Sequence, residues 1–256
     1  MPRVAPWHVA KTVILNLTYY PLFLCYCIAG IPCFTLVCII AIMAQPRVAA
    51  MRQFRKAISW FGLGMIHCLP YPWIRVRFTD EEELDPGEGY IVVCNHNAMS
   101  DIPLLANVPL DLIQVVKSWP FKIPVLGLIA RAAGYVDVTG MSFDVFVEKM
   151  SEQLRKGVSV VAFPEGTRST STELGQFHSG IFRVALAVKC GIVPLCIHGN
   201  ERMPPKGSLA LRPGVVTMCK MPMLTWDDYR GMSHTTLKQH VRQLMADRLR
   251  MMAGAR

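Results

Sequence analysis

The sequence lacks several patterns that identify common classes of protein. No Gly-x-Ser-x-Gly motif occurs, so the turn that exposes a serine nucleophile in α/β-hydrolases is absent. The nine cysteines form no disulfide framework and no paired metal-ligand spacing, which favours reduced thiols. Acidic residues are few, 18 against 27 Lys and Arg, and the net charge of +9 suits an anionic membrane surface or anionic ligands. No nucleic-acid recognition motif occurs, so we predict no nucleic-acid partner.

The segment Thr12–Pro46 contains no charged residue and is long enough to cross a bilayer. Two membrane topologies are compatible with it. One is a single spanning helix over Leu22–Ala44, and the other is a re-entrant hairpin of Val13–Ala29 and Pro32–Gln45 that turns at the Gly30-Ile31-Pro32 step. A buried helix pair in a soluble protein is the remaining alternative.

Basic residues follow this run closely: Arg47, Arg52, Arg55 and Lys56. By the positive-inside rule they place the following domain in the cytoplasm, with the chain in the inner (cytoplasmic) membrane. The segment Met51–Leu69 is amphipathic and basic, so it lies at the membrane interface or packs on the domain. We therefore predict a membrane-anchoring segment over 1–70, which includes the hydrophobic run 12–46, and a second domain over 71–256.

Downstream of this segment, apolar β-branched runs alternate with helical patterns. The expected strands are Ile74–Phe78, Tyr90–Cys94, Leu112–Val116, Tyr135–Val138, Val158–Phe163, Ile192–Ile197 and Val215–Met221. The expected helices are Pro103–Ala106, Phe121–Ala133, Ser142–Lys156 capped by Ser142, Ile181–Cys190 closed by Gly191, and Thr235–Met251. This alternation predicts an α/β fold, with a mostly parallel sheet flanked by helices and preceded by the N-terminal hydrophobic helical element.

Two polar motifs directly follow expected strands. The first is Asn95-His96-Asn97-Ala98-Met99-Ser100-Asp101, and the second is Phe163-Pro164-Glu165-Gly166-Thr167-Arg168-Ser169. Ligands of parallel sheets bind outside the carboxyl ends of the strands, so both motifs lie where an active site is expected.

The residue types in the motifs suit proton transfer and anion binding. His96 is matched to base catalysis near neutral pH, and Asp101 can fix its tautomer and stabilise the imidazolium. Glu165 can accept a hydrogen bond from an acceptor hydroxyl, and Arg168 can hold a phosphate. Without a serine nucleophile, the hydroxyl to be activated is the substrate's own. A satisfied loop histidine and a Glu–Arg pair that braces a loop are the structural alternatives.

With these motifs the chain resembles the glycerolipid (lysophospholipid, 1-acylglycerol-3-phosphate) acyltransferase family. The Asn-His-x4-Asp and Phe-Pro-Glu-Gly-Thr-Arg blocks match the two main family motifs in order and spacing, within Ile74–Thr217. Lys117 followed by Ile123-Pro124-Val125-Leu126-Gly127, and Val193-Pro194-Leu195, give weaker support.

The resemblance implies transfer of a fatty acyl group from an acyl thioester to a lysolipid hydroxyl, most simply from 1-acylglycerol-3-phosphate to phosphatidic acid. His96 would be the general base and Asp101 its orienting partner. Acceptor-binding residues would be Glu165, Gly166, Thr167, Arg168 and Lys117. The co-substrate would be acyl-CoA or acyl carrier protein, the acyl chain would lie in an apolar tunnel or groove, and no metal or other cofactor would be needed.

Departures from the family pattern concern the acceptor. Thr139 and Gly140 stand where the family usually has an Asp-Arg pair, and His178 replaces a lysine. The usual Ser or Thr of the first motif is Ala98. A different lysolipid, a lysophosphodiester or an amino-acid lipid, is therefore an alternative acceptor. An acyl-thioester hydrolase and a non-catalytic lipid-binding protein are further alternatives.

Overall fold

The chain forms two compact units, each built from several stretches of sequence. Unit 1 comprises Met1–Phe78, Asn97–Asn107 and Ile197–Met218, and unit 2 comprises Thr79–His96, Val108–Cys196 and Cys219–Arg256. The computed structural model describes residues 6–116, 118–168, 174–201, 203–204 and 207–254. The functional division into segments 1–70 and 71–256 stays a prediction.

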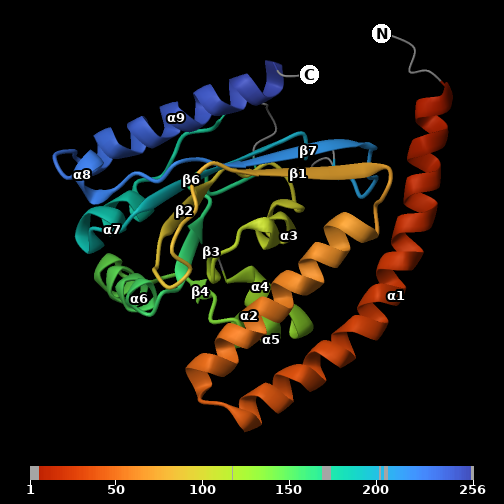
Figure 1. Cartoon of the computed structure of the whole chain (residues 1–256), viewed down its shortest axis with the longest axis horizontal. Helices are drawn as coiled ribbons and strands as arrows, with labels where there is room; N and C mark the ends of the chain where they lie inside the picture. The colour runs from red at the N-terminus through yellow and green to blue at the C-terminus, as the bar shows by residue number, and fades with distance from the viewer. Residues whose placement is uncertain (1–5, 117, 169–173, 202, 205–206, 255–256) are drawn as a thin grey trace. The chain divides into compact units, whose positions relative to one another are not determined.

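The strands form a seven-stranded sheet in the order β1-β7-β6-β2-β5-β3-β4 (Figure 1). The strands are β1 (Ile74–Asp80), β2 (Ile91–Cys94), β3 (Leu112–Val116), β4 (Val136–Asp137), β5 (Ser159–Ala162), β6 (Ile192–His198) and β7 (Gly214–Lys220). β2 pairs in parallel with β5 and β6, and β3 pairs in parallel with β4 and β5. Every residue of β2 and β5 is buried, as is usual for parallel strands covered on both faces. The parallel pairing and this burial confirm the predicted α/β fold.

The described α-helices are α1 (Pro6–Ala44), α2 (Arg47–Leu63), α3 (Asp101–Leu104), α4 (Trp119–Lys122), α5 (Pro124–Ala132), α6 (Phe143–Arg155), α7 (Gly180–Val188), α8 (Trp226–Tyr229) and α9 (His234–Gly254). Of these, α3, α6, α7 and α9 lie close to their expected positions. A π-helical turn, Gly64–Cys68, extends α2, and a short 3-10 turn, Leu105–Asn107, follows α3. Ser142 caps α6 as predicted, because its Oγ accepts a hydrogen bond from the Val145 amide at 3.4 Å.

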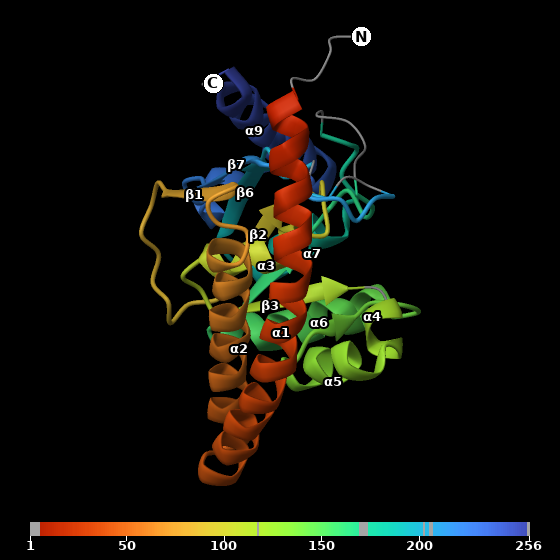
Figure 2. The ribbon, with the colours of Figure 1, turned by 90° about the vertical axis from the view of Figure 1, so that its right-hand side faces the viewer.

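In unit 1, α1 and α2 form an antiparallel helical hairpin, which both ribbon views show side by side (Figures 1 and 2). The rings of Tyr26 and Phe61 stack at 4.5 Å between centroids, and the Tyr26 hydroxyl donates to the Phe61 carbonyl at 3.0 Å. Gly30 permits this approach, because a Cβ there would lie 2.6 Å from Cε2 of Phe61. The connection between the helices lies at residues 45–46.

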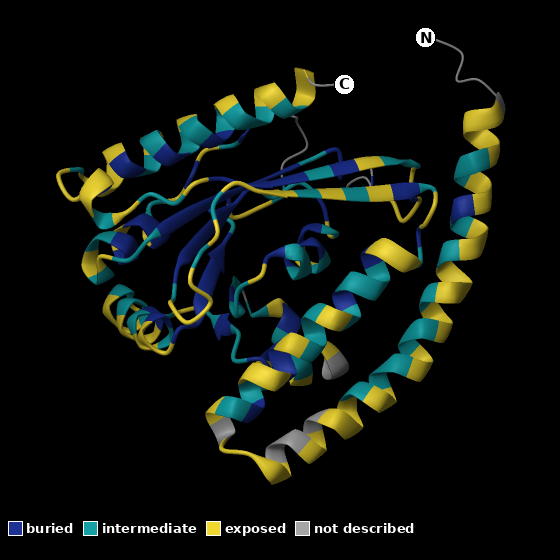
Figure 3. Ribbon diagram, viewed as in Figure 1, coloured by how far each residue is buried: buried dark blue, intermediate teal, exposed yellow. Residues whose placement is uncertain are grey.

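Of the two membrane topologies considered, the re-entrant hairpin of Val13–Ala29 and Pro32–Gln45 is therefore wrong. The helix continues through Gly30 and Pro32, since Gly30 provides close packing against α2 rather than a turn. A helix longer than Leu22–Ala44 results, and its Trp7–Val37 part has a mean hydropathy of 1.8 and is long and apolar enough to cross a membrane. Figure 3 shows exposed residues along the length of α1.

In unit 2, α6, α7 and α9 surround one apolar core. α6 contacts β5 and α7, and α7 contacts α9. Met150 of α6, Phe182 of α7 and Val241 of α9 are fully buried in this core together with the strand residues Val93 and Val160. The amphipathic pattern of 235–251 is thereby confirmed, since Leu237, Val241 and Met245 are its buried residues.

Two local predictions were wrong. The expected helix Phe121–Ala133 is divided into α4 and α5, because Ile123 precedes a proline and takes an extended conformation (φ −84°, ψ 122°). Lys189, and not Gly191, takes the left-handed conformation that ends α7. Gly191 instead makes room for the Met223 side chain, which a Cβ would overlap.

Candidate active site

In unit 2, both motifs begin at the carboxyl ends of neighbouring parallel strands. The register of β2 on β5 pairs Val93 with Ala162, so the chain leaves both strands at the same edge. The His96 amide donates to Oε1 of Glu165 at 2.9 Å, and the His96 ring lies 4.5 Å from that of Phe163. His96 and Glu165 are therefore brought together, as the strand order implied.

Glu165 is buried and holds two segments of main chain. Its Oε2 accepts from the Gly175 amide at 2.9 Å, while Oε1 accepts from His96. A Cβ at Gly175 would lie 2.9 Å from Oε2, so only glycine allows this approach. Charge-assisted bonds to two amides compensate the buried carboxylate. In the structure Glu165 braces the loops, and each of its oxygens keeps a lone pair for a further donor.

The turn after Glu165 contains the other predicted acceptor residues. Gly166 has φ +68°, a conformation that glycine adopts without strain. A Cβ there would lie 3.0 Å from Nε2 of His178, whose own amide donates to the Pro164 carbonyl at 2.7 Å. His178 thus lies against this turn. Thr167 is exposed and Arg168 is partly buried. Lys117, the remaining predicted acceptor residue, lies outside the described residues.

In unit 1, the rest of the first motif folds around Asp101. This carboxylate has no solvent exposure, and its Oδ2 accepts from the amides of Asn97 at 2.7 Å and Ala98 at 3.0 Å. Its Oδ1 accepts from the side-chain amide of Asn200. Three N–H donors compensate the charge, as a buried carboxylate requires. His96 immediately precedes Asn97 in the chain.

Two residues near the site were missed from the sequence. Asn200 lies two residues after β6, and a polar residue at the carboxyl end of a buried strand was a signal that could have found it. Arg242 of α9 donates to the carbonyls of Leu174 at 2.6 Å and Gly175 at 2.8 Å, and so supports the segment that Glu165 binds. Nothing in the pattern of α9 distinguishes Arg242 from its other basic residues.

The segment that departs from the family pattern forms a tight turn. The Thr139 hydroxyl accepts from the Ser118 amide at 3.0 Å, and the Thr139 amide donates to the Asp137 carboxylate at 2.9 Å. Gly140 has φ +70°, and no atom lies within 4 Å of where its Cβ would be. The backbone here suits glycine, and a long basic side chain at position 140 would be strained.

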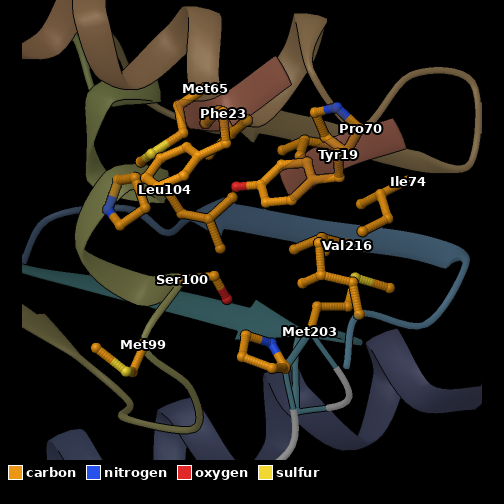
Figure 4. Close-up of a pocket in the computed structure, with 15 residues that line it drawn as sticks. Tyr19, Phe23, Met65, Pro70, Ile74, Met99, Ser100, Leu104, Met203 and Val216 are labelled. Atoms are coloured by element: carbon orange, nitrogen blue, oxygen red, sulfur yellow. The ribbon is translucent and has the colours of Figure 1, made fainter. Parts of the chain in front are cut away.

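Unit 1 also contains a cavity of about 280 Å³ with almost entirely apolar walls (Figure 4). Segments distant in sequence line it, including Tyr19 and Phe23 of α1, Ile74 of β1, Val216 of β7, and Met99 and Ser100 of the first motif. The Asp101 loop therefore supplies part of the cavity wall.

Three thiols of unit 2 are disfavoured as nucleophiles. Burial raises the pKa of the Cys190 thiol to about 12, and burial together with nearby Glu81 raises that of Cys219 to about 11. Burial raises the pKa of Cys196 further still. Nucleophilic cysteines need the thiolate form, so these groups suit packing.

Comparisons with known proteins agree with the two motifs. A model of the Acyltransferase family matches residues 75–198. A chloroplastic 1-acyl-sn-glycerol-3-phosphate acyltransferase of Arabidopsis thaliana is 30% identical over 71% of this chain and 52% of its own length. A lyso-ornithine lipid O-acyltransferase of Pseudomonas aeruginosa is 30% identical over 59% of this chain and 55% of its own length. The chain thus spans about half the length of these two curated relatives.

A solved structure supports the fold. The crystal structure of a 1-acyl-sn-glycerophosphate acyltransferase from Thermotoga maritima superposes with a TM-score of 0.80, covering 97% of this chain and 98% of that one at 22% identity. These findings together support the glycerolipid acyltransferase family for this chain. They confirm the resemblance inferred from the His96 and Glu165 motifs, and the fold is the one expected of it.

Proposed function

We propose that this acyltransferase-family chain moves a fatty acyl group from an acyl thioester to a lysolipid hydroxyl, converting 1-acylglycerol-3-phosphate to phosphatidic acid. The observation that carries the proposal is the bond from the His96 amide to Glu165, which joins the two family motifs at the ends of β2 and β5. Relatives named for acylation of a lysolipid support the reaction class.

In this mechanism the imidazole of His96 removes the proton from the acceptor hydroxyl, whose oxygen attacks the thioester carbonyl. The tetrahedral intermediate then expels the thiolate of coenzyme A or acyl carrier protein. This thiolate receives the proton from the imidazolium. Asp101 orients and stabilises that imidazolium, and its own fixed position comes from Asn97, Ala98 and Asn200. Base catalysis of this kind contributes roughly 10²–10⁴-fold to the rate.

Residues of the second motif bind the acceptor in this mechanism. Arg168 holds the phosphate with its guanidinium group, Thr167 adds a hydroxyl, and Gly166 shapes the turn. Glu165 braces the loop and can accept a bond from the acceptor with a remaining lone pair. Lys117 is a further phosphate-binding candidate, and His178, whose ring lies against the turn at Gly166, can add a hydrogen bond.

An amino-acid lysolipid is the second candidate acceptor. Gly140, with φ +70°, stands where the family usually has an arginine, so one expected phosphate ligand is missing. A relative is named as a lyso-ornithine lipid O-acyltransferase, whose acceptor is not a phosphate monoester. The chemistry at His96 would be the same for both acceptors.

We place the chain in the inner (cytoplasmic) membrane through α1, with the catalytic residues on the cytoplasmic side. The apolar part of α1 and the basic residues of α2 support this orientation. The acyl chain occupies the apolar cavity of unit 1, whose wall includes residues of the Asp101 loop.

The test is acyl transfer from labelled acyl-CoA and acyl carrier protein to a panel of lysolipids, with products identified by mass. His96→Ala should lower transfer by about 10²–10⁴-fold, because the base is removed. His234→Ala is the matched control, since this histidine is exposed at the start of α9 and should leave transfer unchanged.

The product distribution separates the alternatives. Phosphatidic acid as the sole product supports the first acceptor, and an acylated ornithine lipid supports the second. Fatty acid released equally with and without lysolipid would show a hydrolase. Normal turnover by His96→Ala would exclude the mechanism.

A further inference from the structure

A series of hydrogen bonds in unit 2 connects the C-terminal helix α9 to His96. Arg242 of α9 donates from Nη2 to the Leu174 carbonyl at 2.6 Å and from Nε to the Gly175 carbonyl at 2.8 Å. The Gly175 amide donates to Oε2 of Glu165 at 2.9 Å, and Oε1 of Glu165 accepts from the His96 amide at 2.9 Å. All of these residues belong to unit 2, so the whole series lies within one compact unit.

A single peptide group joins Arg242 to Glu165. The Leu174 carbonyl and the Gly175 N–H belong to the same peptide bond, so the guanidinium binds one end of this peptide and the carboxylate binds the other. Hydrogen bonds in series polarise one another, and a cation at the carbonyl oxygen makes the N–H a stronger donor. Arg242 thereby stabilises the charge of the buried Glu165 without touching it.

Packing of α9 gives Arg242 a fixed position. The preceding residue, Val241, is fully buried in the core of unit 2, as are Leu237 and Met245 of the same helix. The planar guanidinium donates to two successive carbonyls, which fixes the direction of the segment that Glu165 binds. Arg242 lies beyond residues 75–198, the part of the chain that the Acyltransferase model matches, so it adds to the site a group that the two motifs do not contain.

We propose that Arg242 is a positioning residue, which acts on His96 through the Leu174–Gly175 peptide and Glu165. Its effect on catalysis rests on the proposed function, in which the His96 imidazole is the general base. Without the guanidinium, the Gly175 amide is a weaker donor, and its carbonyl side loses the bonds that hold the peptide in place. Glu165 then holds the main chain of His96 less firmly, and the imidazole is less often placed for proton transfer.

The kinetic test is a double-mutant cycle on acyl transfer by the full chain in detergent. Arg242→Gln should lower kcat about 10- to 100-fold, the range for a bond to a charged group, with little change in the KM of the acyl donor. Arg242→Lys keeps the positive charge and should lose less. The double variant of Arg242→Gln with Glu165→Gln should be no slower than Glu165→Gln alone, because Arg242 acts through that carboxylate.

Arg250→Gln is the matched control, because Arg250 lies on the same helix, is exposed and pairs with Asp247. Its kcat should equal that of the wild type. An unchanged kcat in Arg242→Gln, or losses that multiply in the double variant, would overturn the inference. A general loss of folding would show itself as multiplied losses, so the cycle separates it from a positioning effect.

A second measurement does not depend on transfer. Amide hydrogen exchange, read by mass spectrometry, is compared for the peptides that contain Gly175 and His96. Exchange in both should be faster in Arg242→Gln and unchanged in Arg250→Gln, and an unchanged His96 peptide in Arg242→Gln would overturn the inference. Faster exchange at both places in a chain whose wild type acylates no lysolipid would refute the proposed function and support the connection of Arg242 to His96. Transfer by the wild type with multiplied losses would refute the role of Arg242 alone.

Discussion

At the scale of single residues, Asp101 is a buried carboxylate whose charge is compensated by main-chain amides of its own motif and by Asn200. The amides belong to Asn97 and Ala98, which lie between His96 and Asp101. A contact of Asp101 with them is therefore local to the motif. Asn200 reaches Asp101 from almost a hundred residues away in the chain, and a contact at that separation has no local sequence signal.

Removing the Asn200 amide should therefore weaken catalysis through Asp101. We expect Asn200→Ala to lower kcat about 10- to 100-fold with little change in the KM of the acyl donor, because a bond to a charged group contributes about 1.5–3 kcal/mol. Steady-state kinetics with varied donor checks this split.

Asn107→Ala is the control for a merely structural effect. Asn107 also belongs to unit 1 and is partly buried there, where it bonds to His67 and to the Leu104 carbonyl. Its removal should affect stability but not kcat. A rise in KM with unchanged kcat in Asn200→Ala would contradict a positioning role.

At the scale of elements, the sequence predicted those helix and strand ends that depend on neighbouring residues. Ser142 marks the start of α6, and β3 has the expected bounds because its apolar run is short and flanked by polar residues. The wrong predictions arose where long-range packing determines the role of a residue. Gly30 and Gly191 each accommodate a side chain from elsewhere, Phe61 and Met223, and neither ends a helix.

The prediction at this scale concerns the stability of the hairpin formed by α1 and α2. Gly30→Leu should destabilise unit 1 by about 1–3 kcal/mol, because its side chain would overlap the Phe61 ring of α2. Thermal unfolding in detergent measures the loss. Gly180→Ala is the matched control, since no atom lies within 4 Å of its Cβ position, and its melting temperature should be unchanged or slightly raised. An unchanged melting temperature for Gly30→Leu would show that the hairpin does not need this close approach.

At the scale of the whole molecule, the buried thiols predict a loss of stability in alkali. Their folded-state pKa values are raised above the ordinary 9.0, to about 12 for Cys190 and about 11 for Cys219. The folded chain thus holds these protons more tightly than the unfolded chain. The corresponding stability is complete below about pH 9 and is lost as the pH rises toward these values.

Urea unfolding between pH 8 and 10.5 should accordingly show a falling midpoint. Cys190→Ala should reduce the fall, while Cys68→Ala, which removes an exposed thiol, should not. A midpoint that stays constant over this range, or an equal fall in Cys190→Ala, would contradict the assignment.

The cavity of unit 1 has a consequence for how substrate range can change. Its wall combines Tyr19, Ile74, Ser100 and Leu211, which come from opposite ends and the middle of the chain. No single exchangeable segment carries the whole lining, so swapping one loop or helix between relatives would alter only one side of it. Variation in acyl preference should therefore accumulate as scattered single substitutions, and a library aimed at that preference should sample these separate positions together.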